Sequence, residues 1–172
     1  MKPQDILVVL KLLSSSWPGS YAAMGEQIGL SASETHAAFR RARQSGLIHP
    51  EQPSPVKSAL AEFLLHGLKY IYPVKPGHRT RGTPTSFAAS PLAAEFASSS
   101  SSENVPVWPD PEGTQSGYEF KPLYQSVPLA AKRDARLYEW LVLVDAIRGG
   151  RARERELAAR MIAKRLGYGK PY

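Results

Sequence analysis

The chain has 172 residues, of which 42% are hydrophobic, so it is long enough to bury one core and a smaller satellite cluster. It contains no cysteine, which excludes a disulfide framework, a thiolate metal site and a cysteine nucleophile. The net charge of +7 and the pI of about 9.7 fit a nucleic-acid partner. Residues 1–50 carry +2, residues 51–120 carry −2 and residues 121–172 carry +7.

The sequence contains no candidate membrane segment, since nothing approaches the roughly 18 apolar residues that a span requires. The apolar run from Ile6 to Leu10 ends at Lys11, and the first residues lack the basic, apolar and small-residue regions of a signal peptide. We therefore expect a soluble, cytoplasmic protein without a membrane partner.

The first 50 residues predict three helices in succession. The first fits Gln4–Ser14 and ends in a turn cluster that runs to Gly19. The second fits Tyr21–Ile28 with Ser20 as its cap, and the third fits Ala32–Ser45.

The next segment begins with a short extended pair, Leu47 and Ile48. It continues through a proline-rich turn or stunted wing at His49–Pro55 and a fourth helix at Val56–Tyr72. That helix has an apolar face made of Leu60, Phe63, Leu64, Leu68 and Ile71.

From residue 73 to residue 128 the periodicity is largely lost, except for a short helix at Pro91–Ala97. This stretch is either a disordered linker, with a mobile serine run at 98–102, or an irregular arm. Such an arm would pack its own aromatic side chains, which are Trp108, Tyr118, Phe120 and Tyr124.

Two C-terminal helices are expected, at 129–148 and 151–166, separated by Gly149 and Gly150. The fold class is therefore mainly α, with an N-terminal helix-turn-helix region (1–72), the arm or linker (73–128) and a C-terminal helical region (129–172). Apolar side chains recur at helical spacing in this last region and are expected in the core or in a dimer contact: Leu137, Trp140, Leu141 and Val144.

Residues 20–48, SYAAMGEQIGLSASETHAAFRRARQSGLI, carry the strongest functional signal. Gly25 lies where two helices approach closely, and Gly29 can take positive φ in the turn between them. Ser31 and Glu34 form an S-x-x-E capping box that fixes the start of the third helix. This is the pattern of a helix-turn-helix, which places its second helix in the major groove of DNA.

The side chains expected to contact DNA lie on and around this third helix: Ser31, Ser33, Glu34, His36, Ala37, Arg40, Arg41 and Arg43. Arginine can bind guanine through two hydrogen bonds or neutralise a phosphate, and serines beside backbone N–H groups can hold phosphate oxygens. The alternative for Arg40, Arg41 and His36 is a solvated surface without a ligand.

Residues 4–72 resemble the winged helix-turn-helix regulators of the multiple-antibiotic-resistance type, on the residues from Tyr21 to Ser31 and from Arg43 to Ile48. The resemblance implies a DNA-binding third helix and a homodimer. One departure concerns the wing, which is a basic β-hairpin in that family. Here Pro50–Pro55 is short, proline-rich and acidic.

The charged run from Arg148 to Glu156 fits either phosphate contacts or a solvated helix face with local Arg–Glu pairs. The basic loop from His78 to Thr85 fits a phosphate or partner contact, with an ordinary surface loop as the alternative. It lacks the spacing of a phosphate-binding P-loop.

We expect no enzyme, cofactor or metal site. The four histidines lack metal-ligand spacing, and neither a nucleophile elbow nor a dinucleotide-binding fingerprint is present. The prediction is a sequence-specific transcriptional regulator that binds double-stranded DNA as a homodimer on a palindromic operator. The alternative is an antitoxin-like or adaptor protein that binds an effector protein through its C-terminal half.

Overall fold

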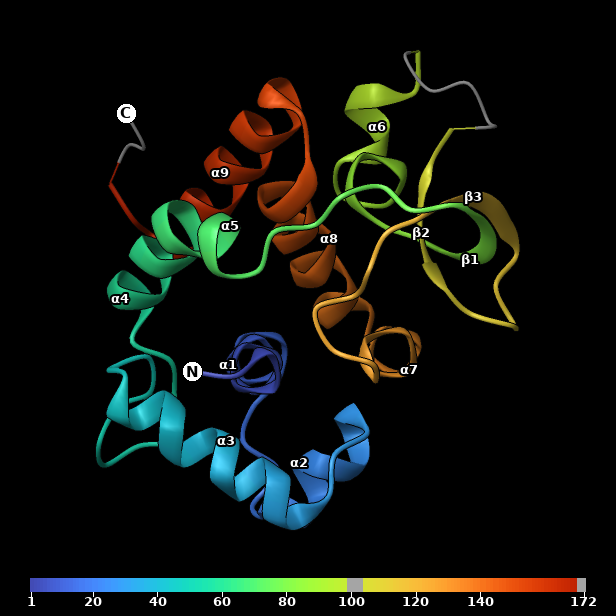
Figure 1. Ribbon diagram of the computed structural model, residues 1–172. Coiled ribbons are helices and arrows are strands. Elements are labelled where there is room, and N and C mark those ends of the chain that lie inside the picture. The colour runs from blue at the N-terminus through green and yellow to red at the C-terminus, as the bar shows by residue number, and fades with distance from the viewer. Residues whose placement is uncertain (99–103, 170–172) are drawn as a thin grey trace.

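The computed structural model describes residues 1–98 and 104–169. Most of this part of the chain is helical, and it includes one small three-stranded sheet. Helices α2 and α3 lie at one end of the molecule, the sheet and α9 lie toward the other, and α1 lies between them (Figure 1). None of the helices in the described residues has the length and apolar character that crossing a bilayer requires.

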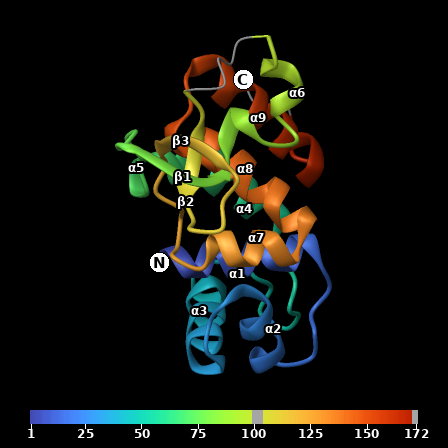
Figure 2. The ribbon, with the colours of Figure 1, turned by 90° about the vertical axis from the view of Figure 1, so that its right-hand side faces the viewer.

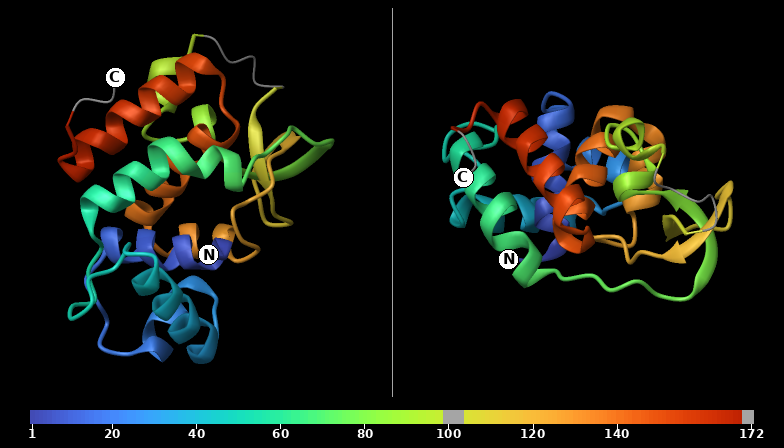
Figure 3. Two further views of the ribbon diagram at one scale, coloured as in Figure 1. Left: turned by 60° about the vertical axis from the view of Figure 1, so that its left-hand side comes forward. Right: turned by 90° about the horizontal axis from the view of Figure 1, so that it is seen from above.

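Helix α1 (Pro3–Ser14) is the central element of the fold. Its start is fixed by Pro3 in the first turn and by Asp5, whose carboxylate accepts a hydrogen bond of 2.8 Å from the backbone N–H of Lys2. The side chains from Asp5 to Leu12 are all buried, and a helix that is buried around its whole circumference belongs inside a protein. Figure 3 shows α1 crossing between the α2–α3 pair and the remaining helices.

Helices α2 (Tyr21–Ile28) and α3 (Ala32–Gln44) have nearly the predicted bounds. After α3, a single bridge pairs Ile48 with Pro55, and the backbone N–H of His49 donates to the carbonyl of Ser54 at 3.0 Å. The described residues thus form a short closed loop at the place of the expected stunted wing.

The predicted fourth helix is present, with one irregular turn. It comprises α4 (Lys57–Glu62), a π-helical turn at Phe63–Gly67 and α5 (Leu68–Ile71). Leu60, Leu64 and Leu68 are buried as expected. Ile71 was predicted on the same face, but it is the last residue of α5 and is 54% exposed.

The stretch from 73 to 128 is neither a linker nor an irregular arm where it is described. Strand β1 (Arg79–Pro84) pairs antiparallel with β2 (Pro106–Pro109) and with β3 (Gln115–Glu119), and β2 and β3 pair in parallel, which closes the sheet. A 3-10 turn at Ser86–Ala88 and α6 (Ala93–Phe96) precede β2, so the predicted short helix is confirmed. Most of the serine run at 98–102 lies outside the described residues.

The sheet is anchored to the C-terminal helices through a buried carboxylate. Asp145 of α8 (Ala135–Gly149) accepts hydrogen bonds from Trp108 Nε1 at 2.6 Å and from Thr85 Oγ1 at 2.7 Å. Arg148 Nη1 donates to the same carboxylate at 2.7 Å, and Arg148 Nε donates to the carbonyl of Tyr72 at 3.0 Å. Trp108 is fully buried and therefore belongs to the main core rather than to a separate arm.

The prediction of one continuous helix at 129–148 is wrong, because two helices occupy this region. Helix α7 (Val127–Arg133) ends before Asp134, whose carboxylate accepts hydrogen bonds from the backbone N–H groups of Arg136 and Leu137 and so caps α8. Helix α9 (Ala152–Leu166) follows Gly150, close to the predicted bounds.

The four residues expected in the core or in a dimer contact are in the core of the single chain: Leu137, Trp140, Leu141 and Val144 are between 0% and 7% exposed. They offer almost no surface to a second copy. The large apolar side chains that are exposed among the described residues are elsewhere: Met1, Tyr70, Ile71 and Leu129.

Asp134 also connects the start of α8 to α1. Its carboxylate also accepts hydrogen bonds from Lys11 Nζ at 2.6 Å and from Ser14 Oγ at 2.7 Å, both on α1. Burial alone raises the pKa of Asp134, but the hydrogen bonds from Lys11, Ser14 and the backbone of Leu137 outweigh it and lower the pKa to about 2.

Because this pKa is lower in the folded protein than its ordinary value of 3.8, Asp134 stabilises the fold above pH 4, and the stabilisation is lost as the pH falls toward 2. We expect Asp134→Asn, which keeps a capping side chain, to lower the free energy of unfolding by about 2 kcal/mol at pH 7. About half of this difference should disappear by pH 3. Urea unfolding of both proteins across this range measures it, and a difference that does not change with pH would contradict the assignment.

Candidate nucleic-acid interface

The turn between α2 and α3 depends on two glycines. Gly29 has a φ of 73°, in the left-handed region that closes α2, and its backbone N–H bonds to the carbonyl of Gly25. A Cβ on Gly25 would lie 2.4 Å from the carbonyl oxygen of Leu30 and 2.7 Å from Thr35 Oγ1. The two helices can therefore approach closely only with glycine at this position, as the sequence predicted.

The start of α3 is fixed by a complete capping box. Ser31 Oγ accepts a hydrogen bond from the backbone N–H of Glu34 at 3.1 Å, and Glu34 Oε2 accepts one from the backbone N–H of Ser31 at 3.2 Å. These two side chains were also expected to contact DNA. Both side chains are exposed, and their polar atoms bond to each other and to the helix backbone. They fix the helix start, and their contact with DNA stays a prediction.

The outward side of α3 carries a stripe of exposed side chains. Ser33, His36, Arg40 and Gln44 are exposed and follow one another at intervals of three or four residues, the spacing of one helix face. Opposite this stripe, α3 buries Thr35, Ala38, Phe39 and Ala42. Helix α3 lies at one end of the molecule in both perpendicular views (Figure 2). We call these four exposed residues the outward stripe.

The side chains of the outward stripe differ in whether they interact with the rest of the protein. The ring of His36 contacts the ring of Tyr21, with centroids 4.8 Å apart. Arg40 has no hydrogen bond or ion pair within residues 1–98 and 104–169, so its guanidinium is available to a ligand. Ala37, also expected at the interface, is only partly exposed and contributes no polar group.

Arg41 requires a correction. It was expected to contact DNA, but its guanidinium forms a two-pronged ion pair with Asp5 of α1, with Nε at 2.9 Å from Oδ2 and Nη2 at 2.7 Å from Oδ1. Asp5 is fully buried, and its hydrogen bonds to Arg41 raise the pKa of the guanidinium. Arg41 therefore holds α3 on α1 and does not belong to the outward stripe.

Arg43 also has internal partners. Its guanidinium carbon lies 5.0 Å from the centroid of the Phe39 ring, and its Nε donates to the carbonyl of His49 at 3.2 Å. Among the three arginines of α3, Arg40 is thus the one without an internal partner in the described residues. Gln44 was not predicted as a site residue, although its position four residues after Arg40 could have indicated it.

Helix α7 supports the α2–α3 turn from behind. A Cβ on Gly29 would lie 2.8 Å from the Cβ of Ser126 and 3.2 Å from Leu129 Cδ2. Arg133 Nη1 of α7 donates a short hydrogen bond to the carbonyl of Glu26 in α2. The sequence carried no local signal for this contact, because the partners lie about a hundred positions apart.

No protein-family model matches the chain, and neither a curated protein nor a solved structure shows detectable similarity to it. Within the described residues, no three histidine, aspartate or glutamate side chains gather as metal ligands.

The close approach at Gly25 predicts the effect of adding a methyl group. Because the Cβ of Gly25→Ala would meet the backbone carbonyl oxygen of Leu30 at 2.4 Å, we expect a loss of roughly 1–3 kcal/mol in the free energy of unfolding. Gly169→Ala is the control, because its Cβ would meet no atom within 4 Å, and we expect a change within about 0.5 kcal/mol. Equal stabilities of the two variants in urea unfolding would refute the packing argument.

The Asp5–Arg41 pair predicts that substitutions of Arg41 and Arg40 differ in their effect on the free energy of unfolding. Arg41→Ala leaves a buried carboxylate without its cation, so we expect a loss of about 2–3 kcal/mol. The neighbouring Arg40→Ala should change stability by no more than about 0.5 kcal/mol, since Arg40 is exposed. A double-mutant cycle with Asp5→Ala measures the coupling, and a coupling near zero would show that the pair does not hold the helices together.

Proposed function

We propose that the protein is a sequence-specific DNA-binding regulator whose helix α3 enters the major groove through the outward stripe. The observation that carries this proposal is the exposure of Ser33, His36, Arg40 and Gln44 on one face of a capped helix that is packed by its opposite face. A helix presented in this way after a tight turn is the reading element of helix-turn-helix proteins.

The dimensions of the outward stripe suit a groove contact. From Ser33 to Gln44 the helix rises about 16 Å, which corresponds to about five base pairs of B-DNA. Arg40 can donate two hydrogen bonds to O6 and N7 of guanine, and Gln44 can pair with N6 and N7 of adenine. Ser33 has a short side chain, and the ring of His36 already contacts Tyr21. Both therefore suit contacts with phosphate or through water.

The proposal does not include a minor-groove contact by a wing. The loop His49–Ser54 is closed by one bridge and contains Glu51 but no lysine or arginine. In the winged helix-turn-helix regulators that residues 4–72 resemble, a basic hairpin tip occupies this place. Recognition by this protein would therefore depend on α3 and on charges outside the loop.

The bound sequence can be obtained by selecting duplexes from a random pool with the full chain. Enrichment of one motif over the pool supports a specific regulator, and a two-fold symmetric motif supports the expected homodimer, because each copy would read one half-site. A protein that retains no duplex at low salt would contradict the proposal.

Arg40→Ala tests the role of α3 on the selected duplex. We expect the mutation to weaken binding by about 1–3 kcal/mol, because the guanidinium has no other partner in the described residues. Arg160→Ala is the matched control, since Arg160 is an exposed arginine of α9 with a side chain that is 63% exposed. Fluorescence anisotropy at fixed salt measures both, and equal losses would show that the effect of Arg40 is only a matter of net charge.

A further inference from the structure

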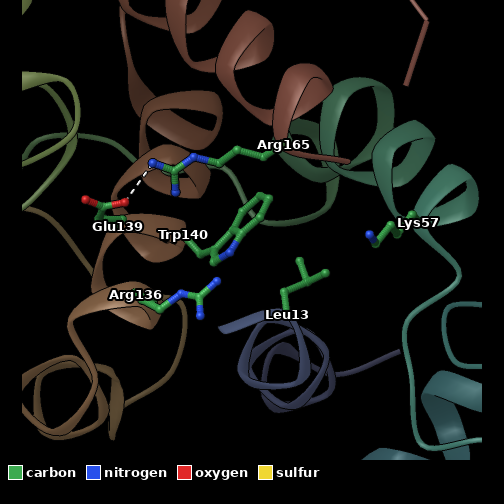
Figure 4. Close-up of a pocket in the computed structure, with 6 residues that line it drawn as sticks. All are labelled: Leu13, Lys57, Arg136, Glu139, Trp140 and Arg165. Atoms are coloured by element: carbon green, nitrogen blue, oxygen red, sulfur yellow. Dashed lines mark hydrogen bonds and ion pairs between the residues drawn. The ribbon is translucent and has the colours of Figure 1, made fainter. Parts of the chain in front are cut away.

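A cavity of about 370 Å³ lies between α1, α4, α8 and α9, and none of its lining residues belongs to the outward stripe. The residues that line it are Leu13, Lys57, Arg136, Glu139, Trp140 and Arg165. Figure 4 shows the indole of Trp140 in the middle of these side chains, with Leu13 below it and with Arg136 and Lys57 on opposite sides. The volume falls within the range of small-molecule sites, which is roughly 300–1,000 Å³.

The cavity has an excess of positive charge. Arg165 is neutralised by Glu139, with Nη2 and Oε2 2.7 Å apart. Lys57 and Arg136 have no ion pair and no side-chain hydrogen bond within residues 1–98 and 104–169. Two exposed, unpaired cations from different helices therefore line one cavity, and their positive charge favours the binding of an anion.

Arg136 lies in the first turn of α8, two residues after the capping carboxylate of Asp134. Its guanidinium is exposed and forms no hydrogen bond or ion pair in the described residues. An anion held by Arg136 and Lys57 would give both cations a partner.

The floor of the cavity is apolar. Trp140 is 7% exposed, and the guanidinium carbon of Arg165 lies 5.5 Å from the centroid of its ring. Leu13 contributes the other apolar side chain. A ligand that fits therefore has an anionic group for the two cations and an apolar body for Leu13 and the exposed edge of Trp140.

We propose that this cavity binds a phosphomonoester with a small apolar body. A phosphomonoester carries about −1.5 to −2 at neutral pH, which matches the two unpaired cations, whereas a carboxylate supplies only one negative charge. The guanidinium of Arg136 can hold two phosphate oxygens at once, and Lys57 adds a point charge. This site is independent of the proposed DNA interface.

Phenyl phosphate is the first probe, with benzoate, phenol and inorganic phosphate as comparisons. We expect phenyl phosphate to bind the full chain with a stoichiometry of one in calorimetry. It should shift the indole N–H signal of Trp140 in NMR spectra, and not that of Trp108, which is bonded to Asp145. Benzoate, phenol and inorganic phosphate should each bind about tenfold more weakly or not at all, because each lacks part of the matching chemistry.

Lys57→Ala and Arg136→Ala should each weaken phenyl phosphate binding by about tenfold or more. Lys164→Ala and Arg160→Ala remove the same charges from exposed positions of α9 outside the cavity and should leave binding unchanged. Thermal unfolding verifies that all four variants are folded. The proposal is overturned if phenyl phosphate does not bind, if the Trp140 signal stays unshifted, if inorganic phosphate binds as tightly, or if the two pairs of variants weaken binding equally.

Discussion

Two ion pairs on the buried helix α1 join the parts of this molecule. Asp5 and Lys11 are charged residues with almost no exposure, and each is matched by one opposite charge from a distant element, Arg41 of α3 and Asp134 at the start of α8. A buried charge without a partner is strongly destabilising, so these pairs are obligatory once α1 is enclosed. In the observed arrangement, α3 and the start of α8 each supply the opposite charge that α1 needs.

The orientation of α3 follows from this constraint. With Arg41 held on α1 and Arg43 bonded to the carbonyl of His49, one side of α3 is fixed to the body of the protein. The opposite side is left exposed with Arg40 on it. Helix α7 supports the turn before α3 and ends at Asp134, the same residue that binds Lys11. The proposed reading helix is thus connected through α1 and α7 to the C-terminal helices.

Local signals in the sequence predicted the local structure. Ser20, Gly29 and the Ser31–Glu34 box marked the limits of α2 and α3 correctly, since caps act within a few residues. The strands were missed because they are only 4 to 6 residues long and contain Gly and Pro, which hides alternation. The role of Arg41 was missed because the sequence does not distinguish an exposed arginine from a paired one. The Lys11–Asp134 pair was missed because its two residues lie 123 positions apart.

The most direct test of the account is to locate α3 on bound DNA. The chain contains no cysteine, so Ser33→Cys provides a single thiol on the outward stripe for an iron chelate that cleaves nearby DNA. We predict cleavage at a few adjacent nucleotides inside the selected site, and no localised cleavage from the same chelate on Arg160→Cys in α9. Localised cleavage from position 160 with none from position 33 would show that another surface faces the DNA.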